Sequence, residues 1–265
     1  MDKIDICKKI KQSTRKIILL DKEQVICGGT GTVVSNRGTM LTANHVVNCY
    51  SKLSHPKIIA YGMGNIPIVE YKPKLLNVSF DIGMPEFVKP LIIDLAILEP
   101  IKTLNGISYI ELGNEIVPEG TDVIMAGFPD EILPPLNFDR ILNFDNPELN
   151  KNRFKIEEFF KVHMCLIMIK SGMIGGTQKI NISGRCEVPG LAKSVKVKGA
   201  TYWIDNASNN GASGGPVVDF SGKLIGIICE KGLTDQEQEV PGLNFKVPSG
   251  ATMALSHNLI TWGLK

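Results

Sequence analysis

The sequence predicts an all-β protein, a barrel or a sandwich built from many short strands. Short runs of β-branched and apolar residues recur along the 265-residue chain, and turn signals separate them. The chain carries 26 Gly and 15 Pro, which suits many tight turns, and only 6% aromatic residues. Strands do not alternate regularly with long helical patterns, which argues against a fold of βαβ units.

The expected strands are stretches of Val, Ile, Leu or Thr bounded by Gly, Pro, Asn or charged residues. In chain order they are Lys16–Leu20, Gln24–Cys27, Gly31–Ser35, Thr39–Ala43, Ile66–Tyr71, Asp94–Leu98, Asp122–Phe128, Val162–Lys170, Lys179–Ser183, Ser194–Lys198, Thr201–Ile204, Pro216–Asp219, Leu224–Glu230 and Leu243–Val247. The clearest turn signals lie at residues 36–38, 105–106, 118–120, 221–222 and 241–242.

A C-terminal helix is expected over residues 249–264. Ser249 can cap its first turn, and Leu255, Leu259 and Trp262 follow at +4 and +3 spacing, which places them on one helical face.

A second helical pattern covers Pro147–Lys161 and lies within a polar stretch, about 130–161, that looks inserted between strands. Long inserts in compact domains are often functional. The alternatives of a substrate-gating or regulatory element and of a tolerated surface excursion both stay open.

Two strand-rich units are expected, because Gly, Asn and Pro interrupt the pattern near residues 112–120. The predicted boundaries are 14–115 for the N-terminal unit and 116–265 for the C-terminal unit. The length suits one large domain or two small ones.

The overall charge argues against nucleic acid as a partner. Lys plus Arg number 29 and Asp plus Glu number 27, a net charge of +2, whereas phosphate recognition requires a concentrated cationic face. No apolar run is long enough to span a bilayer, and no export signal is visible in residues 1–20. We therefore expect a cytoplasmic protein without a membrane span.

The sharpest local motif is NNGASGGP at residues 209–216. Gly residues on both sides of Ser213 allow a sharp bend that presents its hydroxyl group. The N–H groups of Gly211 and Ser213 can then converge as an oxyanion hole. A Gly-rich hairpin turn with an incidental Ser is the alternative.

A nucleophilic Ser requires a base, and the chain has four His. His45 follows an expected strand, although an ordinary core His is its plainer interpretation. His55 lies in a polar loop and His163 has no evident partner.

The third group must be a carboxylate that orients the imidazole. Asp94 interrupts the apolar run LIIDLAIL and is costly to bury unless it is paired. Asp81 is the competing acid in looser surroundings.

Three segments together resemble the trypsin-like serine proteases, closest to the HtrA-like, bacterial-type branch. Residues 28–35 and 41–47 (GGTGTVVS and LTANHVV) resemble its first-barrel strands, residues 94–98 (DLAIL) its acid motif, and residues 205–216 its nucleophile loop. The order His, Asp, Ser is the chymotrypsin order and differs from that of subtilisin and the α/β-hydrolases.

The resemblance implies two packed antiparallel β-barrels with the active site in the cleft between them. His45 and Asp94 would come from the first barrel and Ser213 from the second. Ser213 would attack a peptide carbonyl, His45 would carry its proton, and Asp94 would orient the imidazole. The N–H groups of Gly211 and Ser213 would hold the oxyanion.

The resemblance also implies a specificity pocket, with Ala207 and Gly242 at its floor and Cys229 and Glu230 on its wall. Ala207 stands where trypsin-type enzymes carry an acid for Lys or Arg. An uncharged floor favours a small or medium apolar side chain before the cut, whereas Glu230 would recruit a basic one.

Several positions depart from the family pattern. Ala212 replaces the aspartate that binds a freshly cut N-terminus in zymogens, so we expect activity without N-terminal cleavage. Asn44 replaces a small residue before the His. Cys27 matches a disulfide position whose partner is Val46 here, so that bridge cannot form; Cys49 is a nearby substitute, and free thiols in a reducing interior are the simpler expectation.

The expected partner is a protein or peptide substrate, and no cofactor is expected. No metal is expected either, because the six Cys form no C-x₂-C pair. No PDZ-like module is expected after the protease unit, so control would come from the insert, an oligomer or a regulatory partner. A single dedicated intracellular partner is a further expectation.

Two rival functions remain. One is a protease fold kept as a binding or scaffold module without catalysis. The other is a serine esterase, since residues 211–215 also satisfy G-x-S-x-G and Asp235 and His257 follow in α/β-hydrolase order. That motif must lead into a helix, whereas residues 216–222 look like a hairpin.

Overall fold

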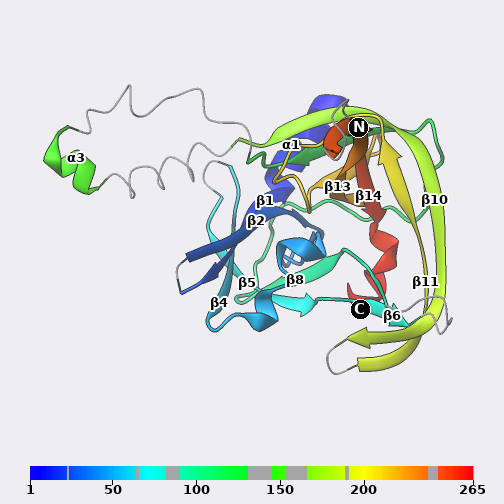
Figure 1. Ribbon diagram of the computed structural model, residues 1–265, viewed down its shortest axis with the longest axis horizontal. Coiled ribbons are helices and arrows are strands. Elements are labelled where there is room, and N and C mark those ends of the chain that lie inside the picture. The colour runs from blue at the N-terminus through cyan, green and yellow to red at the C-terminus, as the bar shows by residue number, and fades with distance from the viewer. Residues whose placement is uncertain are drawn as a thin grey trace.

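A computed structural model describes residues 1–22, 24–63, 66–81, 90–130, 145–152, 166–188, 191–237 and 244–264 of the chain. Strands from the first half of the chain form a closed barrel, and a larger sheet gathers those of the second half (Figure 1). The all-β class and the double-barrel architecture expected from the sequence are confirmed.

The first barrel is closed in the order β1-β2-β3-β8-β5-β4. Neighbouring strands are antiparallel, and Ile17 on β1, for example, faces Gly29 on β2 and Ala60 on β4. The strand bounds are β1 (Thr14–Asp21), β2 (Gln24–Val33), β3 (Met40–Thr42), β4 (Pro56–Tyr61), β5 (Val69–Leu75) and β8 (Ala96–Pro100).

The second sheet runs β11-β14-β13-β12-β9-β10, and an additional pairing of β11 with β10 closes these strands into a ring. Its strands are β9 (Asp122–Gly127), β10 (Met168–Val188), β11 (Leu191–Ile204), β12 (Pro216–Asp219), β13 (Leu224–Glu237) and β14 (Asn244–Ser256). Two short strands of the first half, β6 (Ser79–Asp81) and β7 (Leu91–Ile92), extend this sheet beyond β10.

Strand β9 of the second sheet is apolar on both faces. Val123 and Met125 belong to a cluster with Tyr202, whereas Ile124 and Ala126 belong to the larger cluster that includes the first barrel's core. Successive side chains of a strand point to opposite faces, so one strand contributes to two cores. The ring thereby packs against the barrel and brings residues of both halves to one boundary.

The prediction found most strands but not all. Pro216–Asp219 is reproduced, and single long strands β10 and β11 replace the pairs of shorter strands expected there. Strands β4, β6 and β7 were missed, as was helix α1 (Lys3–Ser13), whose Ile6 and Ile10 are buried.

The expected C-terminal helix over 249–264 is wrong. Strand β14 continues to Ser256, and only two 3₁₀ turns, η3 (His257–Leu259) and η4 (Thr261–Leu264), follow it. Thr252, Ala254 and Ser256 are fully buried, a period of two that suits a strand. Hydrogen bonding to β11 and β13 on either side outweighs the helical spacing of the apolar residues.

Of the predicted insert, the structure describes helix α3 (Pro147–Lys151), which begins where the helical pattern was expected to begin. Residues 153–161 of that pattern lie outside the described residues. The unit boundaries at 14–115 and 116–265 stay a prediction. None of the helices in the described ranges is long and apolar enough to cross a membrane.

Candidate active site

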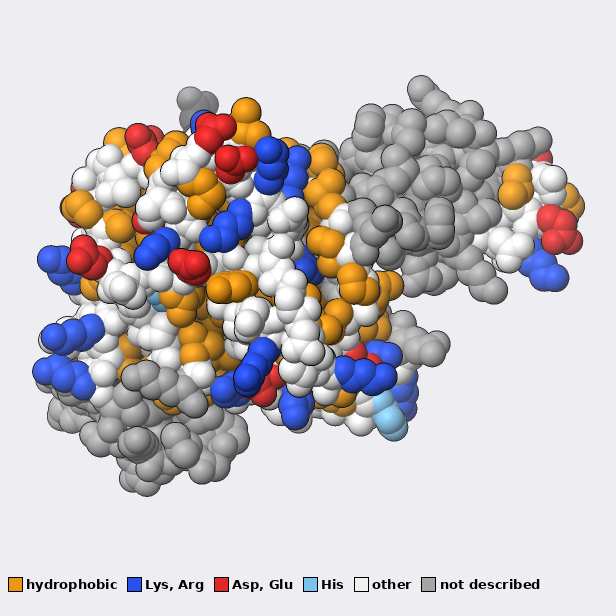
Figure 2. Space-filling model, turned by 180° about the vertical axis from the view of Figure 1, so that it is seen from behind, with side chains coloured by type: hydrophobic (Ala, Val, Ile, Leu, Met, Phe, Trp, Pro, Cys, Tyr) orange, Lys and Arg blue, Asp and Glu red, His pale blue; other side chains and the backbone are white. Residues whose placement is uncertain are grey.

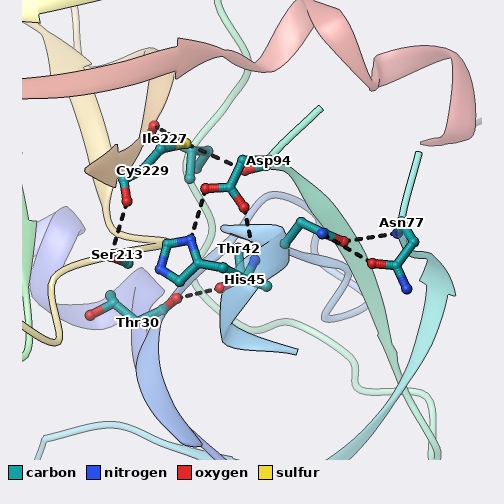
Figure 3. Close-up of polar contacts among 9 residues, drawn as sticks. Thr30, Thr42, His45, Asn77, Asp94, Ser213, Ile227 and Cys229 are labelled. Carbon is teal, nitrogen blue, oxygen red and sulfur yellow. Dashed lines mark hydrogen bonds and ion pairs between the residues drawn. The ribbon is translucent and has the colours of Figure 1, made fainter. Parts of the chain in front are cut away.

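His45 and Asp94 are held together by two hydrogen bonds. His45 lies on the 3₁₀ turn η1 (Asn44–Val46), where its buried neighbours Asn44 and Val46 leave its own side chain partly exposed. One carboxylate oxygen of Asp94 lies 2.8 Å from Nδ1 of His45, and the other accepts the backbone N–H of His45 at 2.8 Å (Figure 3). Asp94 therefore fixes both the backbone and the ring of the histidine.

The Asp94 contact determines the protonation behaviour of His45. The hydrogen bond to Asp94 raises the pKa of His45 above its ordinary value, although burial alone would lower it. The negative charges of Asp94 and Glu230 also raise this pKa. A carboxylate only accepts hydrogen bonds, so the Nδ1 atom that faces it carries a proton. Nε2 is then the nitrogen that can take a proton from another group.

A pair of Asn side chains supports the turn that carries His45. Asn44 donates from Nδ2 to Oδ1 of Asn77 at 3.1 Å and accepts the backbone N–H of Asn77 at 2.8 Å (Figure 3). Asn77 has a positive φ of 53°, which Asn tolerates better than most residues. The polar side chain at position 44 is thus buried with a partner, and the sequence had given no signal for Asn77.

Ser213 lies in a tight loop whose flanking glycines are required by the backbone. Gly211 and Gly214 have φ values of +86° and +92°, a region that disfavours residues with a Cβ. The Ser213 hydroxyl donates to the carbonyl of Cys229 at 3.2 Å. Within the described ranges, no hydrogen bond joins Ser213 to His45.

The first barrel holds this loop through its threonines. The backbone N–H of Thr30 donates to the carbonyl of Ser213 at 2.8 Å, and its hydroxyl donates to the carbonyl of Gly211 at 2.7 Å. Thr42, three residues before His45, donates from Oγ1 to the carbonyl of Thr30 at 2.7 Å (Figure 3). A short chain of hydrogen bonds therefore connects the strand before His45 to the loop of Ser213.

The backbone N–H groups of Gly211 and Ser213 have no acceptor among the described residues. Those of Ala212, Gly214 and Gly215 donate to backbone carbonyls, whereas those of Gly211 and Ser213 do not. These are the two groups predicted to hold an oxyanion.

Cys229 contacts both parts of the site. Its carbonyl accepts the Ser213 hydroxyl, and its thiol lies 3.3 Å from the carbonyl oxygen of Asp94 (Figure 3). Burial raises the pKa of this thiol well above its ordinary value, so it stays protonated and serves as a hydrogen-bond donor.

The predicted specificity pocket is described only in part. Ala207 is half-buried and its carbonyl accepts Nζ of Lys170 at 2.6 Å. Glu230 is exposed, and Gly242 lies outside the described residues. A cavity beside the loop is lined by sequence neighbours of the predicted residues, among them Ser208, Ala212 and Ile228.

The remaining candidate residues lie elsewhere. His55 is exposed in a loop, as expected. His257 is buried, with Nε2 2.8 Å from the Gly113 carbonyl and Nδ1 3.2 Å from the Ile225 carbonyl. His163 and the side chain of Asp81 lie outside what the structure describes.

The cysteines near the site are free thiols. Cys7, Cys27 and Cys49 are half-buried free thiols, and Cys229 is a buried free thiol.

The beginning of the predicted insert contacts the same loop. The backbone N–H of Asp130 donates to the carbonyl of Asn210 at 2.8 Å, and its carboxylate pairs with Lys16 of β1. Residues at the start of the insert therefore link the first barrel to the loop of Ser213.

A histidine paired with a carboxylate and a serine in a glycine-bounded loop, carried by two β-barrels, define the class of trypsin-like serine proteases. The family model for the trypsin-like peptidase domain matches residues 29–227, and the chain belongs to that family. The expected enzyme class, a serine protease, is confirmed.

Solved structures show the same fold. The active form of the Rv3671c protease from M. tuberculosis is 17% identical with a TM-score of 0.56, over 98% of this chain and 82% of that one. Its inactive form is 18% identical with a TM-score of 0.54, over 98% and 91%. The serine endoprotease from Yersinia pestis is 16% identical with a TM-score of 0.57, over 99% and 65%. A sequence search of curated proteins finds no match.

Proposed function

We propose that the protein is a serine endopeptidase in which Ser213, His45 and Asp94 act as a catalytic triad. Ser213 Oγ attacks the carbonyl carbon of a peptide bond while Nε2 of His45 removes its proton. The same proton is then delivered to the leaving amine, and water repeats the sequence on the acyl-enzyme. The N–H groups of Gly211 and Ser213 stabilise the oxyanion.

The observation that carries this proposal is the pair of contacts between the Asp94 carboxylate and His45. One carboxylate oxygen of Asp94 accepts the backbone N–H of His45 and the other faces Nδ1, each at 2.8 Å. This arrangement orients Nε2 and stabilises the imidazolium that forms during attack.

The Ser213 hydroxyl must rotate away from Cys229 for the reaction. Its bond to the Cys229 carbonyl at 3.2 Å is long for O–H···O, and the rotation requires only a change of χ1. Catalytic hydrogen bonds often tighten only when substrate is bound.

A fluorophosphonate probe followed by mass spectrometry of the labelled peptide tests the assignment. We expect a label on Ser213 that Ser213→Ala abolishes and His45→Ala slows strongly. Ser221→Ala, in the exposed turn between β12 and β13, is the control and should keep the label. A label that survives Ser213→Ala refutes the nucleophile, and an unlabelled wild-type protein favours the scaffold function.

The esterase alternative lacks its structural requirement. The residues after Gly215 enter strand β12, which pairs with β13 and β9, and not a helix. His257 has its two ring nitrogens next to the backbone carbonyls of Ile225 and Gly113, and not next to Ser213.

Activity without N-terminal cleavage and a dedicated protein partner are parts of the same proposal. Ala212 is buried in the apolar core of the second ring, and its methyl side chain offers no carboxylate to a new N-terminus. Mapping of the sites cut in candidate partner proteins tests the second part, since indiscriminate digestion would contradict it.

A further inference from the structure

Lys170 reaches from the second sheet to the loop that carries the nucleophile. It lies on β10, is half-buried, and donates from Nζ to the carbonyl of Ala207 at 2.6 Å. Its side chain lines the cavity beneath the loop together with Ser208, Asn209 and Ala212. The ammonium group therefore lies under the segment that leads to Ser213.

No carboxylate pairs with Lys170 among the residues that the structure describes. A half-buried ammonium without a counter-charge is costly, and hydrogen bonds to backbone carbonyls are what compensates it. The contact with Ala207 is short and charge-assisted, and such bonds are about twice as strong as neutral ones.

The neighbouring loop residues are anchored by other groups. Asp205 accepts the backbone N–H of Met173 at 2.7 Å, and Asn206 donates to the Ser171 carbonyl at 2.8 Å. Thr252 of β14 donates to the Asn206 carbonyl at 2.6 Å and accepts the backbone N–H of Ser208 at 2.6 Å. Lys170 supplies the contact at Ala207, which lies between these anchors.

We propose that Lys170 is a positioning residue: its ammonium group, bonded to the Ala207 carbonyl, holds the nucleophile loop in its reactive arrangement. The proposal rests on the proposed function of Ser213. In this proposal the ammonium group of Lys170 orders the loop, so a newly cut N-terminus is not needed for that purpose. Met1, by contrast, lies against the turn at Gly222 between β12 and β13.

The mechanism acts through the oxyanion donors. The loop from Ala207 to Ser213 also contains Gly211, and its N–H groups are effective only if they are fixed before the reaction. Loss of the anchor at Ala207 should loosen these donors more than it weakens peptide binding along the rest of the site. The effect is therefore expected on kcat and on probe labelling more than on KM.

Lys170→Met keeps an apolar stem of similar length but removes the donor. We expect kcat and the rate of fluorophosphonate labelling to fall roughly ten- to a hundredfold, the loss expected for one charge-assisted hydrogen bond. Lys170→Arg, which keeps a donor, should retain more of the rate than Lys170→Met. Lys179→Met, an exposed position on the same strand, is the matched control and should behave as wild type.

Chemical rescue separates positioning from a general loss of stability. Propylammonium replaces the missing part of the side chain in Lys170→Ala, and n-propanol is its neutral counterpart. Recovery of labelling with propylammonium but not with n-propanol supports the proposal. Equal rates with both additives, or a wild-type rate in Lys170→Met, would overturn it. A wild-type protein that does not label would instead count against the proposed function itself.

Discussion

The hydroxyl of Thr30 donates to the carbonyl of Gly211 at 2.7 Å, and so joins strand β2 of the first barrel to the loop of Ser213 in the second. The same hydroxyl accepts the backbone N–H of Phe128 at 3.0 Å. One side chain on β2 therefore contacts both the loop and the residue that follows β9. Because His45 belongs to the first barrel, this bond helps to set the position of His45, the proposed base, relative to Ser213, the proposed nucleophile.

Thr30→Val should reduce both stability and activity. It keeps the shape of the side chain but leaves the Gly211 carbonyl and the Phe128 N–H without their partner, a loss of about 1–3 kcal/mol in the free energy of unfolding. Thr30→Ser keeps the hydroxyl and should cost less. Urea unfolding of both variants measures the difference; equal losses would show that the hydroxyl is unimportant.

Asp94→Asn should lower kcat by about four orders of magnitude. An amide NH₂ can donate to Nδ1, which places the histidine proton on Nε2 and removes the base from Ser213. Steady-state kinetics on a peptide substrate measures the loss. A variant within tenfold of wild type would contradict the role of Asp94.

The raised pKa of His45 should appear in the pH profile of kcat/KM. Neutral His45 is the proposed base, so activity should rise with pH as the ring loses its proton, with a midpoint above the ordinary value of 6.5. Asp94→Asn removes the main cause of the shift, so its residual activity should have a lower midpoint. Measurements between about pH 5 and pH 8 test both statements.

Gly214→Ala should disrupt the nucleophile loop. A Cβ at this position would lie 1.8 Å from the Thr30 carbonyl oxygen, and the φ of +92° is itself unfavourable for Ala. Gly250→Ala is the control, because Gly250 has a similar φ of +84° but nothing within 4 Å of an added Cβ. We expect the control to lose about 1–2 kcal/mol and Gly214→Ala to lose more, together with its probe labelling.

His257 should make the protein sensitive to acid. Burial lowers the pKa of His257 from 6.5, so its neutral form is favoured in the folded state. Its contribution to stability is present above pH 6.5 and is lost as the pH falls through the folded-state value. The melting temperature of His257→Gln should therefore vary less with pH on the acid side than that of wild type.

The residues of the proposed triad stand out in the sequence because each lies next to a strand with a distinctive local pattern. Asp94 interrupts an apolar run, and Ser213 is bounded by glycines that its backbone angles require. Such signals are local, so they can be recognised in the sequence alone.

The supporting residues were not predictable, because they act across the fold. Thr30 lies 181 residues before the carbonyl that it bonds, and Lys170 lies 37 before Ala207. The prediction of a C-terminal helix was wrong for a related reason. Its apolar spacing favours a helix, but two neighbouring strands offer hydrogen bonds that no local pattern reveals.

The face of the molecule shown in Figure 2 does not separate its charges into large fields. In the view of Figure 2, Lys and Arg side chains are spread over the face with Asp and Glu among them. A dedicated substrate would then be selected by shape and by the side chains beside the scissile bond more than by long-range attraction.

The pairing of β6 with β10 affects how the chain must fold. Ser79, Phe80 and Asp81 hydrogen-bond to residues 185–187, more than a hundred positions later, although β6 lies in sequence between two strands of the first barrel. A growing chain cannot complete this contact until β10 has been made. We therefore expect the two halves to melt in a single cooperative transition. If the chain is divided between the two halves, neither fragment should fold alone, and the two should fold when they are mixed.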